Sequence, residues 1–116
     1  MSDATHVDCP ARAVLDHVTK RWAVLILTGL REGPLRFSEL HVKVAGISEK
    51  MLAQTLRTLV RDGLIVRTVH PCTPPAVSYE LSGLGDGISG LVQGLVSWIG
   101  DHTADVHAAH EAYVKP

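Results

Sequence analysis

Two amphipathic stretches separated by a three-residue turn constrain the fold of this chain more than any other feature. Ser38 is expected to cap the first stretch, and residues 45–47 (Ala-Gly-Ile) are expected to form a tight turn. Ser48 then caps a second helix, which Gly63 ends. Two neighbouring helices joined by a short turn that contains glycine are typical of a helix-turn-helix.

The second of these helices has one apolar and one polar face. Leu52, Leu56 and Leu59 recur four and three residues apart, so they share one face of a helix. Met51 we assign to the core or to the turn. The opposite face carries Glu49, Lys50, Gln54, Arg57 and Arg61. This polar face is the candidate binding surface.

Two β-branched stretches follow the second helix. Residues 64–70 and 77–81 flank the segment Pro71-Cys72-Thr73-Pro74-Pro75, which predicts a β-hairpin with a proline-stiffened tip. A helix-turn-helix followed directly by a hairpin is a winged helix-turn-helix. The predicted fold class is therefore α+β and mainly α, in a single domain (1–116) with a core over residues 20–81.

Two helices are expected before the helix-turn-helix. Asp8 is expected to cap a helix over residues 9–19. The apolar run from Trp22 to Leu27 fits a buried strand or a buried helix by periodicity alone. Leu30 continues the pattern and Gly33-Pro34 ends it, which favours a central core helix.

The last segment, residues 82–112, is predicted as one long helix capped by Ser82. It has more apolar surface than one small domain covers, in two rows: Leu84, Ile88, Leu91, Leu95 and Trp98, and beside them Val92, Val96 and Ile99. Four glycines share another face: Gly83, Gly87, Gly90 and Gly94. Close helix packing at a subunit interface explains them, and a flexible, partly frayed helix is the alternative.

Charge is distributed unevenly along the 116 residues. The formal net charge of −1 by itself argues against a nucleic-acid partner. Residues 12–70, however, carry a net charge of +5, while residues 1–11 carry −2 and residues 71–116 carry −4. This asymmetry indicates a polyanionic partner, with chance clustering on a solvated surface as the alternative. No apolar run is long enough to cross a bilayer and the first residues are polar, so we expect a cytoplasmic protein without membrane association.

Several short motifs lie between Cys9 and Trp98, and their order and spacing match those of a known protein family. They are Cys9-Pro10, Lys20-Arg21-Trp22 leading into Leu25-Ile26-Leu27, the run Gly33-Pro34-Leu35-Arg36-Phe37-Ser38-Glu39-Leu40, the run Gly46-Ile47-Ser48-Glu49-Lys50-Met51-Leu52, Leu56-Arg57-Thr58-Leu59, Asp62-Gly63-Leu64-Ile65, the run Pro74-Pro75-Ala76-Val77-Ser78-Tyr79-Glu80-Leu81, and Leu84-Gly85. With these motifs the chain resembles the HxlR family of winged helix-turn-helix transcriptional regulators, relatives of the MarR group. The resemblance implies a homodimer formed by helices 9–19 and 82–112. It also implies that each recognition helix enters a DNA major groove, with each wing beside the minor groove.

Two wing positions depart from the family pattern. Many members have a basic residue where this chain has Ala76, and an aromatic residue where it has His70. The resemblance therefore implies a wing that holds DNA less tightly than is usual, with Arg67 as its main cation.

The expected contacts to double-stranded DNA come mainly from the second helix of the motif. Ser48 lies at its N-terminus, where a hydroxyl and free backbone N–H groups suit a phosphate. Lys50, Gln54 and Arg57 project from its polar face, and such side chains read guanine or adenine in the major groove. Phosphate contacts are assigned to Arg36, Arg61 and Arg67, and Ser38 completes the set. Without the helix-turn-helix these would be ordinary solvated positions.

Cys9 and Cys72 are candidate redox sensors. Both are expected to be free thiols in a cytosolic protein. The predicted helix N-terminus and Arg12 favour the thiolate of Cys9, while Asp8 opposes it. The resemblance adds that some relatives respond to electrophiles or oxidants through a cysteine at this position. A small residue that fills a helix start is the alternative for Cys9, and its pairing with Cys72 stays open.

Metal binding and catalysis are not expected. His107, His110 and Glu111 share a helical face and are weak metal candidates, with a solvated helix end as the alternative. No cofactor is predicted. The sequence contains neither a nucleophile elbow nor a P-loop, so we do not expect an enzyme.

The sequence therefore predicts a regulator of transcription that binds specific DNA, acts as a homodimeric repressor and recognises a pseudo-palindromic operator. One alternative keeps the fold but makes the protein a cysteine-based sensor, with a small electrophile or another inducer as its signal. The other alternative is a winged helix that binds proteins and not DNA, which Ala76 in the wing keeps open.

Overall fold

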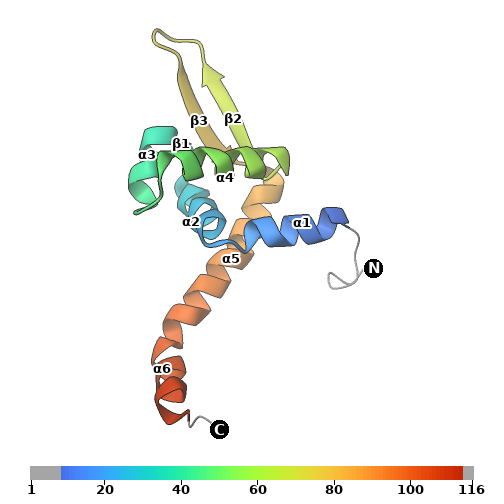
Figure 1. The fold of residues 1–116 in the computed structure, drawn as a ribbon. Coiled ribbons are helices and arrows are strands. Elements are labelled where there is room, and N and C mark those ends of the chain that lie inside the picture. The colour runs from blue at the N-terminus through green and yellow to red at the C-terminus, as the bar shows by residue number, and fades with distance from the viewer. Residues whose placement is uncertain (1–8, 114–116) are drawn as a thin grey trace.

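The computed structural model describes residues 9–113, except for the side chain of Cys9. Its helices are α1 (Cys9–Val18), α2 (Arg21–Gly29), the short 3-10 helix η1 (Leu30–Glu32), α3 (Phe37–Lys43), α4 (Glu49–Arg61), α5 (Gly83–Asp101) and α6 (Thr103–Ala112). Its strands are β1 (Leu35–Arg36), β2 (Ile65–His70) and β3 (Ala76–Leu81). Figure 1 shows β2 and β3 projecting from one end as a wing, and α5 with α6 projecting from the other. The predicted winged helix-turn-helix is confirmed.

Helix α4 begins and ends where the sequence predicts. The hydroxyl of Ser48 accepts a hydrogen bond from the Met51 N–H at 3.1 Å, so Ser48 is its N-cap. After the helix, Gly63 has φ +78°, a conformation that favours glycine. The predicted stripe of Leu52, Leu56 and Leu59 is buried, so the polar face is left outward.

Helix α3 begins two residues earlier than predicted, and Ser38 is not its cap. Phe37 is already helical and the N-cap position is Arg36. The carboxylate of Glu39 accepts a hydrogen bond from the Arg36 N–H at 2.7 Å. This bond satisfies one of the backbone donors that a helix start leaves without a partner. Ser38 lies exposed in the first turn.

The sheet has three antiparallel strands in the order β1-β3-β2. The predicted hairpin of β2 and β3 pairs from Ile65 opposite Leu81 to His70 opposite Ala76. The two residues just before α3 form β1, which pairs Leu35 with Tyr79. This pairing fixes the start of α3 to the base of the wing.

Helix α2 lies at the centre of the core, as its apolar run predicts. Ile26 and Leu27 are fully buried, as are Leu40 of α3 and Leu52 of α4. The remaining buried apolar side chains are Val18, Ala23, Leu30, Val44, Ile47, Leu56, Leu59, Leu64, Ile65 and Val92. The core therefore joins the helix-turn-helix, the base of the wing and one contact from α5.

A line of small residues holds α5 against this core. An added Cβ at Gly85 would lie 1.9 Å from the Leu64 carbonyl oxygen, so only glycine fits there. Ser89 is fully buried and accepts a hydrogen bond from the Arg31 guanidinium at 2.8 Å. Val92 is also buried, which corrects its placement in a surplus surface row.

The predicted glycine face is open within the single chain. An added Cβ would meet no atom within 4 Å at Gly83, Gly87 or Gly94, and at Gly90 it would meet only the Arg31 side chain. The close approach inside the chain belongs to Gly85 instead. Packing of the glycine face against a second subunit stays a prediction.

The predicted long C-terminal helix is two helices. His102 interrupts it with φ −115° and ψ 12°, after which α6 begins at Thr103. The side chains of His102 and Thr103 bond the carbonyls of Trp98 and Ile99, both at 2.8 Å, and so compete with the backbone ladder. The N-cap of α5 at Ser82 is confirmed, since its hydroxyl accepts the Gly85 N–H at 3.0 Å.

Beyond Val92, α5 and α6 contact little of the core. Leu95, Trp98 and Ile99 are 51%, 57% and 52% exposed, and Leu91, just before Val92, is 72% exposed. The radius of gyration is 17.1 Å, whereas a compact chain of this length has roughly 13 Å. No helix in residues 9–113 is long and apolar enough to span a membrane.

Candidate nucleic-acid interface

The polar face of α4 forms a row of exposed side chains. Lys50, Gln54, Arg57 and Arg61 are all exposed and recur at intervals of four, three and four residues, so they lie on one side of the helix. Met51, next to this row, is 38% exposed, which corrects its assignment to the core. The row presents amide and cationic groups along a helix of 13 residues.

The turn before α4 fixes the direction of this row. Gly46 has φ +91°, which lets the chain reverse between α3 and α4. The His41 side chain bonds the Ile47 carbonyl, with Nε2 3.0 Å from the oxygen. Ser48 follows at the N-terminus of α4, exposed, with its oxygen engaged by the Met51 N–H. The hydroxyl hydrogen of Ser48 is still available to an anion.

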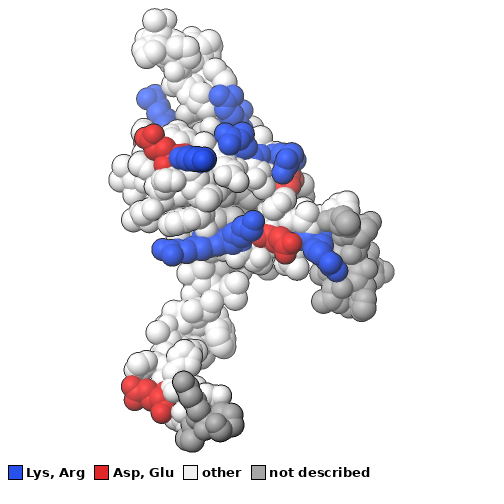
Figure 2. Space-filling view, in the orientation of Figure 1, with Lys and Arg blue, Asp and Glu red and all other residues white. Residues whose placement is uncertain are grey.

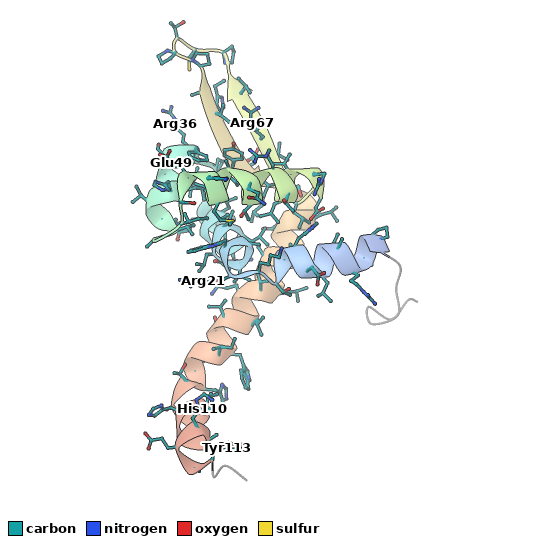
Figure 3. The ribbon with its side chains drawn as sticks, viewed as in Figure 1. Arg21, Arg36, Glu49, Arg67, His110 and Tyr113 are labelled. Atoms are coloured by element: carbon teal, nitrogen blue, oxygen red, sulfur yellow. The ribbon has the colours of Figure 1, made fainter. Side chains whose placement is uncertain are left out.

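The wing side of α4 carries Arg36 and Arg67. Figure 3 shows both beside the base of the wing, on the same side of α4. They are exposed and come from strands that flank β3 on its two sides, β1 and β2. Ser38 lies exposed close by in the first turn of α3. Farther along the wing, His70 Nε2 is 2.9 Å from the Ser78 hydroxyl.

Basic side chains gather around α4 and the base of the wing in Figure 2. Within residues 9–113 none of the five cations predicted to contact DNA forms an ion pair: Arg36, Lys50, Arg57, Arg61 and Arg67. Two other basic residues do have structural partners, since Lys43 bonds the Gly29 carbonyl at 2.9 Å and Arg31 bonds Ser89. The cations of this face are therefore free for an anionic ligand.

The structure brings a further basic residue, Lys20, to a cleft beside α4, with Arg21 next to it in the sequence. Lys20 and Arg21 lie where α1 meets α2, and the Arg21 guanidinium lies 4.6 Å from the centre of the Trp22 ring. Both residues belong to the basic segment 12–70, but neither was predicted to contact DNA. Their only signal was the motif Lys20-Arg21-Trp22, because helical periodicity does not show that α2 packs beside α4.

One short contact ties α1 to the end of α4. His17 Nδ1 lies 2.7 Å from the Asp62 carboxylate, and both side chains are largely buried. Asp62 is the C-cap of α4, so α1 is anchored to the helix that carries the row of polar residues.

Cys72, a sensor candidate, lines a groove together with Arg36 and Ser38 of this face, and the other sensor and metal candidates lie apart from it (Figure 1) or outside the described residues. Cys72 is exposed at the wing tip, where Sγ lies 3.1 Å from the Pro74 carbonyl oxygen. The Cys9 side chain and the expected Asp8 cap lie outside the described residues. His107 pairs with Glu111 at 3.0 Å, and in residues 9–113 no group of three or more His, Cys, Asp or Glu side chains is placed to hold a metal.

Comparison with known proteins supports the same architecture. The profile of the HxlR-like helix-turn-helix family matches residues 17–107. An uncharacterized HTH-type transcriptional regulator of Escherichia coli K12, YtfH, is 50% identical over 103 residues, which are 89% of this chain and 82% of that protein. Both similarities include the helix-turn-helix and the wing.

Two solved structures show how far the similarity in fold extends. YtfH from Salmonella typhimurium is 46% identical, superposes with a TM-score of 0.87, and covers 96% of this chain and 99% of its own. The reduced form of the redox regulator HypR is 26% identical, with a TM-score of 0.78 over 86% of this chain and 99% of its own. The projecting C-terminal region is thus included in the YtfH superposition.

Proposed function

This chain belongs to the HxlR-like helix-turn-helix family of transcriptional regulators, and from that premise we propose that it binds specific DNA sequences through α4. One observation supports the proposal most. The exposed row of α4 combines an amide with cations that have no ion-pair partner within residues 9–113. A DNA major groove accepts an α-helix and presents hydrogen-bonding base edges to it.

The roles divide by side-chain chemistry. Lys50 and Arg57 donate hydrogen bonds to guanine, and Gln54 bonds adenine through its amide. Arg61 from α4, Arg36 and Arg67 from the wing side, and Ser38 and Ser48 from the two helix starts hold phosphates. These phosphate contacts position α4, while the base contacts select the sequence.

The functional unit we propose is a homodimer. The apolar face around Leu91, Leu95 and Trp98 and the open glycine face of α5 would pack against α1 and α5 of a second subunit. A two-fold dimer with two recognition helices matches a pseudo-palindromic operator. Such a dimer bound over a promoter would act as a repressor, in the cytoplasm and without catalytic activity.

A cysteine-based response to oxidants or electrophiles is a second candidate function. Cys72 is exposed at the wing tip, and the similar structure HypR is described as a redox regulator. If the protein has this second function, chemical modification of Cys72 or Cys9 would change its affinity for the operator. A Cys9→Ser, Cys72→Ser protein that still released DNA on treatment with a thiol oxidant would overturn it.

DNA binding is tested by a gel shift on the DNA that flanks the protein's own coding region, at several salt concentrations. Specific binding is expected to resist excess random-sequence competitor and to weaken steeply with salt, because bound phosphates release counterions. A protein that leaves this DNA unshifted, or that random competitor removes as easily as specific competitor, would contradict the proposal for this region. Removing the charge of Arg67 should weaken binding to all duplexes and flatten the salt dependence.

A further inference from the structure

A cleft of about 400 Å³ separates α4 from the junction of α1 and α2. One wall is made by Gln54, Thr55 and Thr58 of α4, and the opposite wall includes Lys20 and Trp22. Gln54 also belongs to the polar row of α4. The cleft therefore opens directly beside the surface that we propose to face DNA bases.

One cation, Lys20, lines this cleft, and a second, Arg21, lies next to it in sequence over the ring of Trp22, which also lines the cleft. Lys20 is exposed. Trp22 packs partly buried against the core, so it holds Arg21 at a defined place. Neither Lys20 nor Arg21 forms an ion pair with another residue of the described chain.

The acidic groups near the cleft are few. The carboxylate of Asp62 is already engaged by His17 at 2.7 Å. Asp16 of α1 is exposed and does not line the cleft, and Figure 2 shows acidic atoms beside the basic band below α4. Lys20 lines the cleft and no Asp or Glu of the described residues does, so the formal charge of its lining is positive.

These cations lie across α4 from the wing. In Figure 3, Arg36 and Arg67 are beside the wing, and Arg21 is on the other side of α4. The major groove of B-DNA is about 12 Å wide and an α-helix with side chains is about 10–12 Å across. A helix in the groove is therefore flanked by two phosphate backbones, one on each side.

We propose that the cleft between α4 and the α1–α2 junction binds the phosphodiester backbone of the DNA strand that lies across the groove from the wing. Lys20 and Arg21 contact phosphates of this strand, while Arg36 and Arg67 contact the other. The inference rests on the proposed DNA-binding function and adds to it a second phosphate site. With both strands held, α4 is fixed in depth and angle within the groove.

The test measures the binding of a fluorescently labelled random-sequence duplex between 50 and 200 mM salt. Lys20→Gln and Arg21→Gln are each expected to lower the slope of log K against log salt by about 0.9, the value for one phosphate contact. The ratio of the wild-type association constant to that of each variant then falls by about 3.5-fold between 50 and 200 mM salt. Lys20→Arg keeps the charge and should keep the slope.

Arg12→Gln is the matched control, because Arg12 is exposed on α1 and does not line the cleft. It removes the same charge and is expected to leave the slope unchanged. If Lys20→Gln and Arg21→Gln leave the slope unchanged, or if Arg12→Gln lowers it equally, the second phosphate site is wrong. Circular dichroism of each variant checks that the fold is retained.

Phosphate ethylation on a duplex selected for tight binding assigns the strands. Some phosphates will no longer interfere with binding when they are ethylated, because a variant has lost its contact to them. Those of Lys20→Gln should lie on the strand across the major groove from those of Arg67→Ala. Loss at the same phosphates would overturn the inference while leaving DNA binding intact. If the wild-type protein binds no duplex at any salt concentration, the proposed function itself fails.

Discussion

Gln54 combines exposure with a chemistry that its neighbours lack. It is the one amide in a row of cations, and both the polar face of α4 and the cleft beside it include this side chain. A cation attracts every phosphate, whereas an amide bonds adenine with two matched hydrogen bonds. At the residue scale, we therefore expect Gln54 to contribute more to the preference for particular DNA sequences than to the overall affinity for DNA.

Gln54→Ala is expected to lose about 1–3 kcal/mol of discrimination between a selected duplex and a random one, because a bidentate contact to a base contributes that much. Binding to random DNA should change little, since no charge is removed. Competitive anisotropy with both duplexes measures the ratio of affinities. An equal loss for both duplexes would show that Gln54 does not read a base.

Gly85 is the residue that the packing of α5 depends on most. Gly85→Ala would place a methyl group 1.9 Å from the Leu64 carbonyl oxygen, and backbone cannot yield as a flexible side chain does. We expect a loss of at least about 1–3 kcal/mol in the free energy of unfolding, the usual cost of overpacking. Urea denaturation measures it.

Gly100→Ala is the control for this substitution. An added Cβ at Gly100 meets no atom within 4 Å, so alanine should raise stability by roughly 0.5–1 kcal/mol through its helix propensity. Equal effects of the two substitutions would show that the contact between α5 and Leu64 is looser than the structure has it.

At the scale of elements, helix caps decide where α3 and α4 begin. Ser48→Ala removes the hydroxyl that accepts the Met51 N–H and should cost about 1 kcal/mol of unfolding free energy. Ser38→Ala should cost less than about 0.5 kcal/mol, because Ser38 is exposed and caps nothing. A thermal or urea melt of both variants checks this, and a larger loss for Ser38→Ala would contradict the assigned caps.

The helix-turn-helix, the wing and the α4 row could be predicted because their signals are local. Leu52, Leu56 and Leu59 identify the buried face of α4, and the opposite face follows from periodicity. The start of α3 could not be predicted in this way. Both Ser38 and Glu39 are able to satisfy a backbone donor, and the pairing of Leu35 with Tyr79 decides where the strand stops and the helix starts.

Features that depend on distant contacts were not predictable from the pattern. Gly85 was one glycine among several in α5, and only its position against Leu64 distinguishes it. Lys20 likewise gains a place beside α4 through the packing of α2. The last helix is interrupted at His102, where the side chains of His102 and Thr103 bond the carbonyls of Trp98 and Ile99.

At the scale of the whole molecule, the exposed apolar face of α5 requires a partner surface. Leu95→Asp is expected to convert the protein to a monomer at micromolar concentration with its helix content unchanged, because a charge at a buried subunit contact is unfavourable. Sedimentation equilibrium gives the mass. Val42→Asp, on the 80%-exposed Val42 of α3, should leave the mass of the wild type.

If the wild-type protein is itself a monomer, or if Val42→Asp dissociates it as well, the assignment of the interface to α5 is wrong. A monomer would also remove the reason to expect a two-fold operator. The oligomeric state therefore links the apolar face of α5 to the symmetry of the DNA site.

Selection of duplexes from a random pool by the wild-type protein tests the central claim most directly. We expect enrichment of an inverted repeat whose half-sites are about 10–10.5 base pairs apart or a multiple of this, the spacing of two recognition helices in a dimer. The selected duplex should bind at least about 10³-fold more tightly than random DNA at physiological salt. A pool that yields no shared sequence, or selected duplexes that bind no better than random ones, would contradict the claim that α4 reads DNA sequence.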